Sequence, residues 1–457
     1  MSILNRTTIS CISWILFFCT VSGQEKMLTK DVAVSLALEN NYGIKVAKNS
    51  IEVAENNKSI LNSGYLPRVT GSAGANYGNL NSTTEYPGRL ETDGSPTADI
   101  ELNGAESQTY NAALSVNYTL FDGLNRFYNY KKLKEQYKLT NLQARETIEN
   151  TIIQLFSVYY EVARLTENEK VFKQALEISK QRIKRAEYAF EYGQSTKLDV
   201  LNAQVDVTND SINIMNAAQS LNNVKRDLNV ILNQELKDLY AVDTVIRFIP
   251  RLQLEEYITQ AKENNVNLLI ADKGLKINAY DIKVNKSGYL PTIGLTGSYG
   301  WNLNQSAPSP FVSGQIFPGT NRTSDNIALG ASLSWNLFDG GGTTVRVKNA
   351  KIAQLNQELL VKQVVLEVHR DIENALEIYE NRLHIFKIQE QNVITNANNF
   401  ERSKEQFQLG RITSIEFRQA QINLLNAQTN KNLAKYDAKL SELQLLQLTG
   451  QLLNVAF

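Results

Sequence analysis

Apolar and polar residues alternate along four stretches of the chain, at residues 68–79, 108–121, 292–302 and 326–338. In the second stretch one face carries Tyr110, Ala112, Leu114, Val116, Tyr118 and Leu120, and the other carries Asn111, Ser115, Asn117 and Thr119. A period of two over ten or more residues, with aromatic residues toward the ends of the apolar face, is typical of a transmembrane barrel strand. The alternative is a half-buried sheet in a soluble sandwich, but soluble strands are usually shorter.

A second pattern, with apolar residues three and four positions apart, fills residues 123–192 and 340–409. In the later segment it includes Val365, Val368, Ile372, Ala375, Tyr379, Leu383 and Phe386. This is coiled-coil spacing, and a helix of ~70 residues would be about 105 Å long. Each long helix should end at a glycine, Gly193 or Gly410, and a return helix should follow at residues 196–233 and 414–449.

Short motifs join the strands to the helices. "GYLP" precedes the first strand of each pair, where proline lacks a backbone donor and should end a helix. "LFDG" follows the second strand, where the aspartate is placed to cap the long helix. The predicted joins are Pro67, Asp122, Gly123, Pro291, Asp339 and Gly340.

The two halves of the chain repeat one another. "SGYLPRVTGSAGANYG" from Ser63 matches "SGYLPTIGLTGSYG" from Ser287, and "EYGQSTKLDVLNAQ" from Glu191 matches "QLGRITSIEFRQAQ" from Gln408. The matches keep the same order at offsets of 217 to 224 residues. We therefore expect two tandem structural repeats, at residues 24–250 and 251–457, each with two strands, a long helix and a return helix.

Four strands cannot close a barrel, and an open sheet edge in lipid leaves backbone groups without hydrogen bonds. Several chains should therefore share one barrel. Two chains would give eight strands and an interior filled by side chains, whereas three would give twelve strands and a lumen.

The N-terminus has the composition of a secretory signal peptide, with Arg6 before an apolar core at residues 12–21. Cleavage after Gly23 would make Gln24 the first mature residue. Lipid attachment at Cys19 is an alternative that the bulky Phe18 disfavours. Cys11 and Cys19 are the two cysteines of the chain and both precede the cleavage site, so we expect no disulfide in the mature protein.

Composition and motifs indicate no enzyme, cofactor or metal site. Lys plus Arg equals Asp plus Glu, so no global charge favours nucleic acid. The two histidines, His369 and His384, would lie ~22 Å apart on one helix and could not share a metal. "GGGTT" at residues 340–344 lacks the lysine and spacing of a phosphate-binding loop.

The tandem repeat, with "GYLP", "LFDG" and "YGQSTKLDVLNAQ" at matching places, resembles the TolC family of outer-membrane efflux channels over essentially the whole mature chain. The resemblance implies a homotrimer with a twelve-stranded barrel in the outer membrane lipid of a Gram-negative bacterium and an α-helical tunnel across the periplasm. It also implies a periplasmic adaptor and an inner-membrane pump as partners.

Export of small molecules through such a tunnel is therefore the expected function. One alternative is the exit duct of a type I protein-secretion system. A non-conducting outer-membrane scaffold is a further alternative, which the small polar residues on one face of the strands disfavour.

The resemblance assigns roles to the two helical turns. In the family these tips meet the adaptor, which places Gly193, Gln194, Ser195, Thr196, Gly410, Arg411, Ile412 and Thr413 at that contact. The alternative is that the tips are plain turns.

The resemblance also implies an acidic ring at the periplasmic entrance, formed by Asp199 and Glu416. Gln419 stands where some family members have a second acid. A tyrosine and an arginine hold the entrance shut in some members, but Phe407 lacks the hydroxyl here and Arg411 is one place early. The alternative is that Glu416 is a surface acid paired with Arg418 or Arg411.

Overall fold

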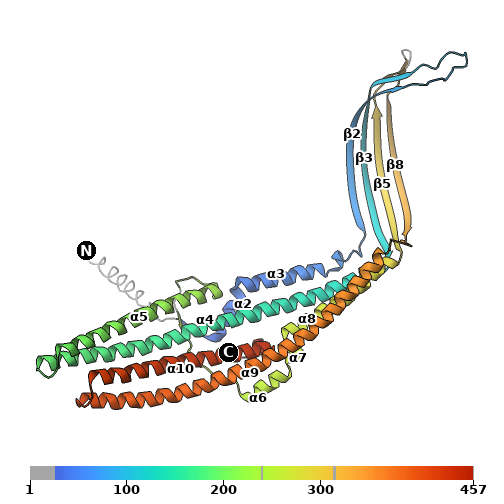
Figure 1. Ribbon diagram of the computed structural model, residues 1–457. Helices are drawn as coiled ribbons and strands as arrows, with labels where there is room; N and C mark the ends of the chain where they lie inside the picture. Colours follow the sequence, from blue (N-terminus) through green and yellow to red (C-terminus); the bar gives the residue numbers. More distant parts are fainter. Residues whose placement is uncertain (1–25, 238–239, 312–314, 456–457) are drawn as a thin grey trace, which may run out of the picture. The chain divides into compact units, whose positions relative to one another are not determined.

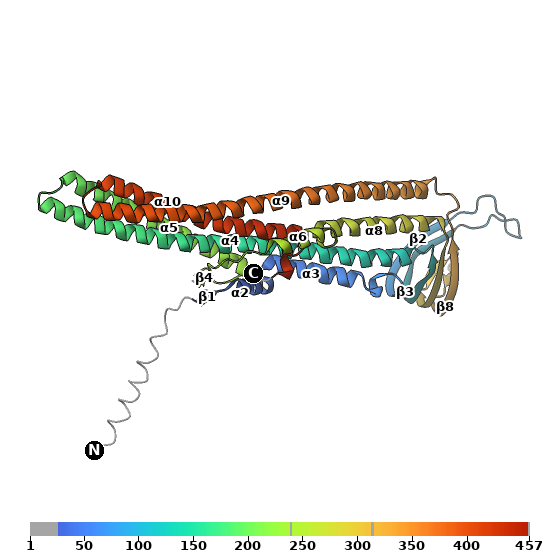
Figure 2. The same ribbon diagram turned by 90° about the horizontal axis from the view of Figure 1, so that it is seen from below.

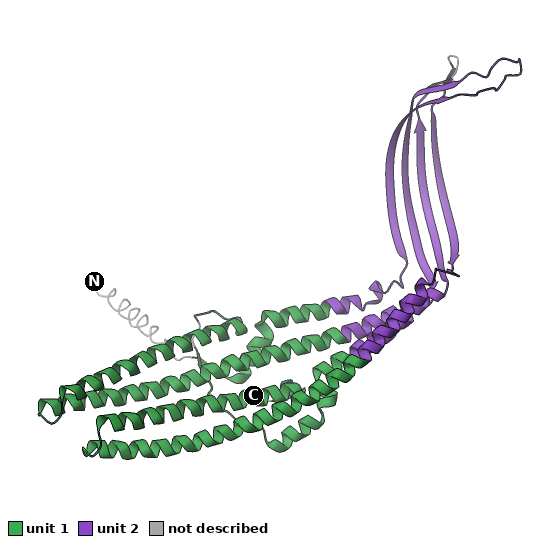
Figure 3. Cartoon of the chain, in the orientation of Figure 1, with its two compact units in different colours: residues 1–52, 139–272, 359–457 green, residues 53–138, 273–358 purple. Residues whose placement is uncertain are grey.

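The computed structural model describes residues 26–237, 240–311 and 315–455. The chain forms two compact units, each assembled from separate segments (Figure 3). Unit 1 comprises residues 1–52, 139–272 and 359–457, and unit 2 comprises residues 53–138 and 273–358. The expected signal peptide, with Cys11, Cys19 and Gln24, lies outside the described residues.

A four-stranded antiparallel sheet dominates unit 2 (Figure 1). Its strands are β2 (Arg68–Thr84), β3 (Ile100–Asp122), β5 (Thr292–Ser306) and β8 (Thr320–Ser334), in the order β2-β3-β5-β8. Two short strands, β6 (Ser309–Phe311) and β7 (Gln315–Phe317), pair with each other. Strands from the two halves of the sequence thus share one sheet, because β3 pairs with β5.

The register of this sheet places like residues beside one another. One row across the four strands joins Val69, Val116, Gly297 and Leu329. The next row on the opposite face contains Thr70, Ser115, Ser298 and Ala328. Directly opposed residues lie on the same face, so the sheet has one apolar face and one face of small polar residues.

All four strands extend further into polar sequence than the alternation predicts. Beyond a register shift near Leu80, Ser82–Thr84 still pair with residues 100–102, and β5 and β8 pair up to Ser306 and Thr320. Backbone hydrogen bonds suffice for such pairing, whereas alternation of hydropathy requires an apolar neighbour on one face. The strand ends predicted near residues 79, 108, 302 and 326 are therefore wrong.

The end of the fourth strand is also earlier than predicted. β8 stops at Ser334, which pairs with Thr292, so Trp335 and Leu337 lie outside the sheet. The next partner would be Pro291, whose ring nitrogen has no hydrogen to donate. The indole Nε1 of Trp335 instead donates to the carbonyl of Tyr289 at 3.1 Å.

Long helices make up most of the chain (Figure 1). The helices are α2 (Lys30–Asn40), α3 (Tyr42–Asn57), α4 (Asn125–Glu191), α5 (Lys197–Leu232), α6 (Arg251–Thr259), α7 (Ala261–Asn264), α8 (Val266–Lys286), α9 (Gly342–Gln408) and α10 (Ser414–Leu448). Short 3-10 turns occur at Ile60–Asn62, Ser287–Tyr289 and Leu452–Asn454. Across the described residues, every helix falls short of the length or hydropathy needed to cross a bilayer.

The main core lies in unit 1, where α4, α5, α9 and α10 run side by side (Figures 1 and 2). Phe156, Tyr159 and Tyr160 of α4 are almost fully buried there. The Tyr159 hydroxyl donates to the Leu28 carbonyl at 2.7 Å and accepts from the Asp243 amide at 2.9 Å. It thereby anchors the parallel pair of β1 (Lys26–Leu28) and β4 (Tyr240–Val242) to α4.

The aspartates of the two "LFDG" motifs bind first-turn amides of the long helices. Asp122 Oδ2 accepts from the Arg126 amide at 3.0 Å, and Asp339 Oδ2 accepts from the Thr343 amide at 2.7 Å. Gly123 has φ +66°, and an added Cβ would lie 2.6 Å from the Ser287 carbonyl. The close approach as well as the backbone angle therefore requires glycine at this join.

The other residues of the joins lie beside them. Gly340 has φ +68°, which favours glycine. Pro67 and Pro291 lie directly before β2 and β5. The prediction that Pro67 ends a helix is wrong, because α3 already ends at Asn57 and Ser59 then caps a separate 3-10 turn.

Candidate functional site

The turn between α4 and α5 has a specific hydrogen-bond pattern around Gly193. The Gly193 amide donates to the Phe190 carbonyl at 3.0 Å, and the Gln194 amide donates to the Ala189 carbonyl at 2.7 Å. This pair of bonds defines a Schellman motif, which needs a left-handed residue at the position of Gly193. Its φ is +70°, so glycine is required by the backbone.

The turn between α9 and α10 repeats this geometry at Gly410, where φ is also +70°. The Gly410 amide donates to the Phe407 carbonyl at 3.1 Å, and the Arg411 amide donates to the Gln406 carbonyl at 2.8 Å. The two turns are at the same end of unit 1 (Figures 1 and 2). An added Cβ at either glycine would meet no atom within 4 Å, so both glycines are surrounded by open space.

Each return helix begins with a capping box. The Thr196 hydroxyl accepts from the Asp199 amide at 3.4 Å, and the Asp199 carboxylate accepts from the Thr196 amide at 3.0 Å. At the second turn the corresponding distances between Thr413 and Glu416 are 3.2 and 2.8 Å. Both acids of the expected ring therefore have a local role, because each satisfies a backbone donor that the helix leaves free.

These hydrogen bonds also set the charge of the two acids. The backbone amide and then the hydroxyl of Thr196 lower the pKa of Asp199, and Thr413 lowers the pKa of Glu416 in the same way. A lowered pKa means that the bonds stabilise the fold above the ordinary pKa and lose that effect as the pH falls through the lowered one. Both carboxylates are therefore ionised at neutral pH.

A hollow of about 500 Å³ lies between the two turns. It is lined by Arg185, Ala186, Tyr188, Ala189, Tyr192, Gln194, Ser195, Asp199, Phe407, Gly410, Ile412, Thr413 and Ser414. The fold thus brings predicted tip residues of both turns around one space. Gly193, Thr196, Arg411, Glu416 and Gln419 are not among those lining residues.

Phe407 of α9 packs against α10. Its ring stacks on Phe417 at 4.9 Å with an interplanar angle of 3°, and Phe417 stacks in turn on Phe400 at 5.5 Å. The Arg185 guanidinium lies 4.9 Å from the Phe407 ring centre and donates to the Gln408 carbonyl at 2.7 Å. The arginine beside Phe407 is therefore Arg185 of α4, and sequence reasoning did not identify it.

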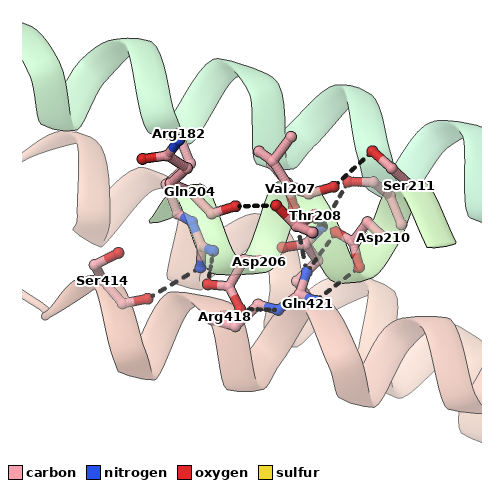
Figure 4. A network of polar contacts seen from close by, with 12 residues as sticks. Arg182, Gln204, Asp206, Val207, Thr208, Asp210, Ser211, Ser414, Arg418 and Gln421 are labelled. Carbon is pink, nitrogen blue, oxygen red and sulfur yellow. Dashed lines mark hydrogen bonds and ion pairs between the residues drawn. The ribbon is translucent and has the colours of Figure 1, made fainter. Parts of the chain in front are cut away.

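A network of buried charges joins α4 and α5 to α10 (Figure 4). The Arg418 guanidinium makes two bonds to Asp210, at 2.7 and 2.8 Å, and its Nε lies 3.4 Å from Asp206. Asp206 also pairs with Arg182 of α4, and Ser179 donates to Asp210 at 2.6 Å. The expected alternative pairing of Glu416 with Arg418 is wrong, because Arg418 points to α5 instead.

One sequence signal could have revealed part of this network. The buried residues of α5 include Val200, Ala203, Asp210 and Ala217, so Asp210 stands in register with the apolar stripe. A carboxylate in a coiled-coil seam needs a charged partner, because burial of an unpaired charge is costly. The sequence alone could not name Arg418 as that partner, since it lies 208 residues away.

Glu416, Gln419 and Asn423 share one exposed stripe of α10, next to the buried Phe417 and Ala420. The Gln419 side-chain amide donates to Asn423 Oδ1 at 2.9 Å. The stripe is polar and carries one charge in its first two turns.

The two histidines lie apart from this site. His369 Nε2 is 3.7 Å from Glu373, with both side chains exposed. His384 lines a hollow of about 370 Å³ beside Phe248 and Tyr379. Within residues 26–237, 240–311 and 315–455, no three His, Cys, Asp or Glu side chains gather in a way that could hold a metal ion.

Comparison with known proteins identifies relatives over most of the chain. The model of the family described as "Outer membrane efflux protein" matches residues 33–234 and 257–451. "Outer membrane protein TolC" of Vibrio cholerae is 25% identical over 317 residues, which are 68% of this chain and 70% of that protein. "Outer membrane efflux protein BepC" of Brucella suis is 22% identical over 422 residues, which are 92% of this chain and 85% of that protein.

Solved structures share the fold. The CmeC outer membrane channel of Campylobacter jejuni superposes with a TM-score of 0.71 at 18% identity, covering 93% of this chain and 86% of CmeC. VceC of Vibrio cholerae gives a TM-score of 0.69 at 14% identity, covering 92% of this chain and 96% of VceC.

Proposed function

Because this chain belongs to the outer membrane efflux protein family and is an outer-membrane channel rather than an enzyme, we propose that three copies join their sheets into one twelve-stranded barrel. The observation that carries this proposal is that the sheet of a single chain has an exposed apolar face and two open edges. Its apolar face is exposed, with Ile327, Leu329 and Leu333 at 73, 85 and 66%. β2 and β8 are its edges, so each has backbone groups free to pair with another chain.

The trimer is testable by mass. The native mass of the channel in mild detergent should equal three chains. Twelve strands enclose an open lumen, whereas the interior of an eight-stranded barrel is filled by side chains. Native mass spectrometry at several detergent concentrations gives this number. A stable mass of one or two chains would contradict the proposal.

The polar face of the sheet, in this arrangement, lines the lumen and the long helices continue the conduit through the periplasm. We also propose that residues 24–250 and 251–457 are tandem repeats, each supplying two strands and one helical hairpin. The channel accepts small molecules from an inner-membrane pump through a periplasmic adaptor. The adaptor contacts the two turns, where both Schellman glycines are surrounded by open space.

The acids of the capping boxes form the entrance ring in this proposal. Hydrogen bonds within the capping boxes lower the pKa values of the Asp199 and Glu416 carboxylates, so both stay negatively charged. Fixed negative charge at a constriction favours cations. Gln419 follows Glu416 on the same exposed stripe, at the position where some family members have a second acid. The entrance therefore has one ring of acidic residues rather than two.

Replacing Glu416 by Gln should reduce cation selectivity without disturbing the turn. Gln at this position also completes a capping box, so the substitution removes the charge and keeps the cap. The reversal potential of single channels under a salt gradient should move toward zero, and further in the double variant with Asp199→Asn. The matched control is Glu390→Gln, which removes an exposed acid on α9 about 30 Å from the turn at Gly410. An unchanged reversal potential in the double variant would rule out the ring.

A further inference from the structure

A basic hollow lies among the helices of unit 2, outside the site described above. Its volume is about 440 Å³, and it is lined by Lys58, Lys131, Lys134, Glu135, Tyr137, Lys138 and Tyr280. These residues come from α3, α4 and α8. Glu135 is the one carboxylate among these lining residues, and it already pairs with Lys138 at 2.7 Å and Lys273 at 3.6 Å.

Positive charge is concentrated in the surrounding helical segments. Residues 125–138 of α4 contain five basic side chains and one acid, a net charge of +4. Residues 273–286 of α8 contain four lysines and one acid, a net charge of +3. The whole chain has a formal charge of zero, so this excess is a local property. Such a surface attracts anions.

The lysines of α4 extend toward the sheet. α4 begins three residues after β3 ends at Asp122, and helical side chains lean toward the helix N-terminus. The Lys131 ammonium lies 4.4 Å from the Phe127 ring centre, and the Lys134 ammonium lies 4.3 Å from that of Tyr130. Each lysine thus reaches back over an aromatic ring one turn nearer the strands.

The depth of these lysines matches a lipid headgroup layer. Lys131 is six residues after the helix start, a rise of about 9 Å. The headgroup region adds roughly 5–8 Å to each side of the hydrocarbon. Phe127, Tyr128 and Tyr130 lie in the same turns, and aromatic residues are enriched where a protein crosses from lipid to water.

We infer that this basic hollow binds the phosphate of an anionic phospholipid in the periplasmic leaflet of the outer membrane. Clustered lysines beside a membrane recognise acidic headgroups through charge, and basic pockets at that level hold them. Lys131 and Lys134, both exposed, contact the phosphate, while Lys58 and Lys138 form the sides of the hollow. The ligand is a lipid because the lysines lean toward the strands that enter the membrane.

The test compares lipid binding by the full-length channel and its Lys131→Gln/Lys134→Gln variant. Purified channels receive phosphatidylglycerol or phosphatidylcholine in detergent, and native mass spectrometry counts the lipids retained. The wild type should prefer phosphatidylglycerol. Each lysine near an acidic surface contributes about fivefold to binding, so the double variant should bind phosphatidylglycerol roughly 20- to 30-fold more weakly. Phosphatidylcholine binding should be unchanged.

Two matched variants separate charge from folding. Lys180→Gln/Lys184→Gln removes two exposed lysines from the same helix in unit 1 and should leave lipid binding unchanged. Lys131→Arg/Lys134→Arg keeps the charge and should retain the preference for phosphatidylglycerol. Equal loss in the arginine and glutamine variants, or in the unit 1 control, would overturn the inference. The melting temperature of each variant checks that the fold is intact.

Other anions are excluded by two further measurements. Inorganic phosphate at millimolar concentration should not displace phosphatidylglycerol, and a lysine-dependent displacement would assign the hollow to free phosphate. Isolated peptidoglycan should bind the wild type and the Lys131→Gln/Lys134→Gln variant equally. Lysine-dependent retention on peptidoglycan without a preference for phosphatidylglycerol would assign the surface to the cell wall and overturn the lipid site.

Discussion

Replacing Arg418 by Met should lower the free energy of unfolding by about 3–5 kcal/mol, the typical effect of removing one partner from a buried ion pair. Arg418 makes two bonds to Asp210, whose side chain is 3% exposed. After the substitution, Ser179 still donates to Asp210, but a hydroxyl does not offset a buried negative charge. Denaturant unfolding in detergent, followed by the fluorescence of the chain, gives the change in stability.

A second substitution distinguishes loss of charge balance from loss of packing. Arg418→Met combined with Asp210→Leu removes both charges and leaves apolar groups of similar size, which should recover most of the lost stability. Arg411→Met changes an exposed arginine near the same turn and should shift stability by less than about 0.5 kcal/mol. If the double variant is as unstable as Arg418→Met, the network stabilises unit 1 through packing rather than through charge.

Replacing Gly193 and Gly410 together by Val should abolish export while the trimer still forms. Both glycines have φ +70°, where an L-residue costs roughly 1–2 kcal/mol and a β-branched one more. An added Cβ meets no atom within 4 Å, so the strain should reshape the turns without disturbing the packed core. Drug sensitivity of a deletion strain that carries the variant measures export, and native mass measures the trimer.

Substitutions that differ in backbone preference provide the controls. Asn tolerates the left-handed region, so Gly193→Asn with Gly410→Asn should retain much more export than the valine variant. Gly71→Val makes the same chemical change in a strand, where φ is ordinary and no atom lies within 4 Å of an added Cβ. It should leave export intact. Full export by the valine variant would mean that the turns serve only to connect helices.

The two turns also illustrate how far a sequence can be interpreted. The glycines of "YGQST" and "LGRIT" predicted where the long helices end, and both turns form a Schellman motif followed by a capping box. The acids three residues after the threonines were expected from the family resemblance as a ring. Their capping role could have been predicted from the spacing, because Thr-x-x-Asp and Thr-x-x-Glu are capping-box patterns. Whether they form a ring stays a prediction.

The sequence by itself determined the features that depend on neighbouring residues. Alternation with a period of two predicted strands within β2, β3, β5 and β8, and a repeat of three and four predicted the long helices. "LFDG" predicted that Asp122 and Asp339 bind free helical amides, which they do, although the helices begin three residues after each aspartate rather than directly after it. Each depends on backbone angles, hydrogen-bond donors and side-chain periodicity within a few residues. Such local preferences have the same physical basis in any fold.

Only the tertiary structure decided which distant side chains meet. Asp210 and Arg418 are 208 residues apart, and Arg185 reaches Phe407 from another helix. Pro291 ends β8 because the register places it opposite Trp335. These contacts depend on how helices pack and strands align, and many side chains in a long amphipathic helix could serve equally well as partners. Local sequence therefore fixes each element, whereas packing selects its charged and aromatic neighbours.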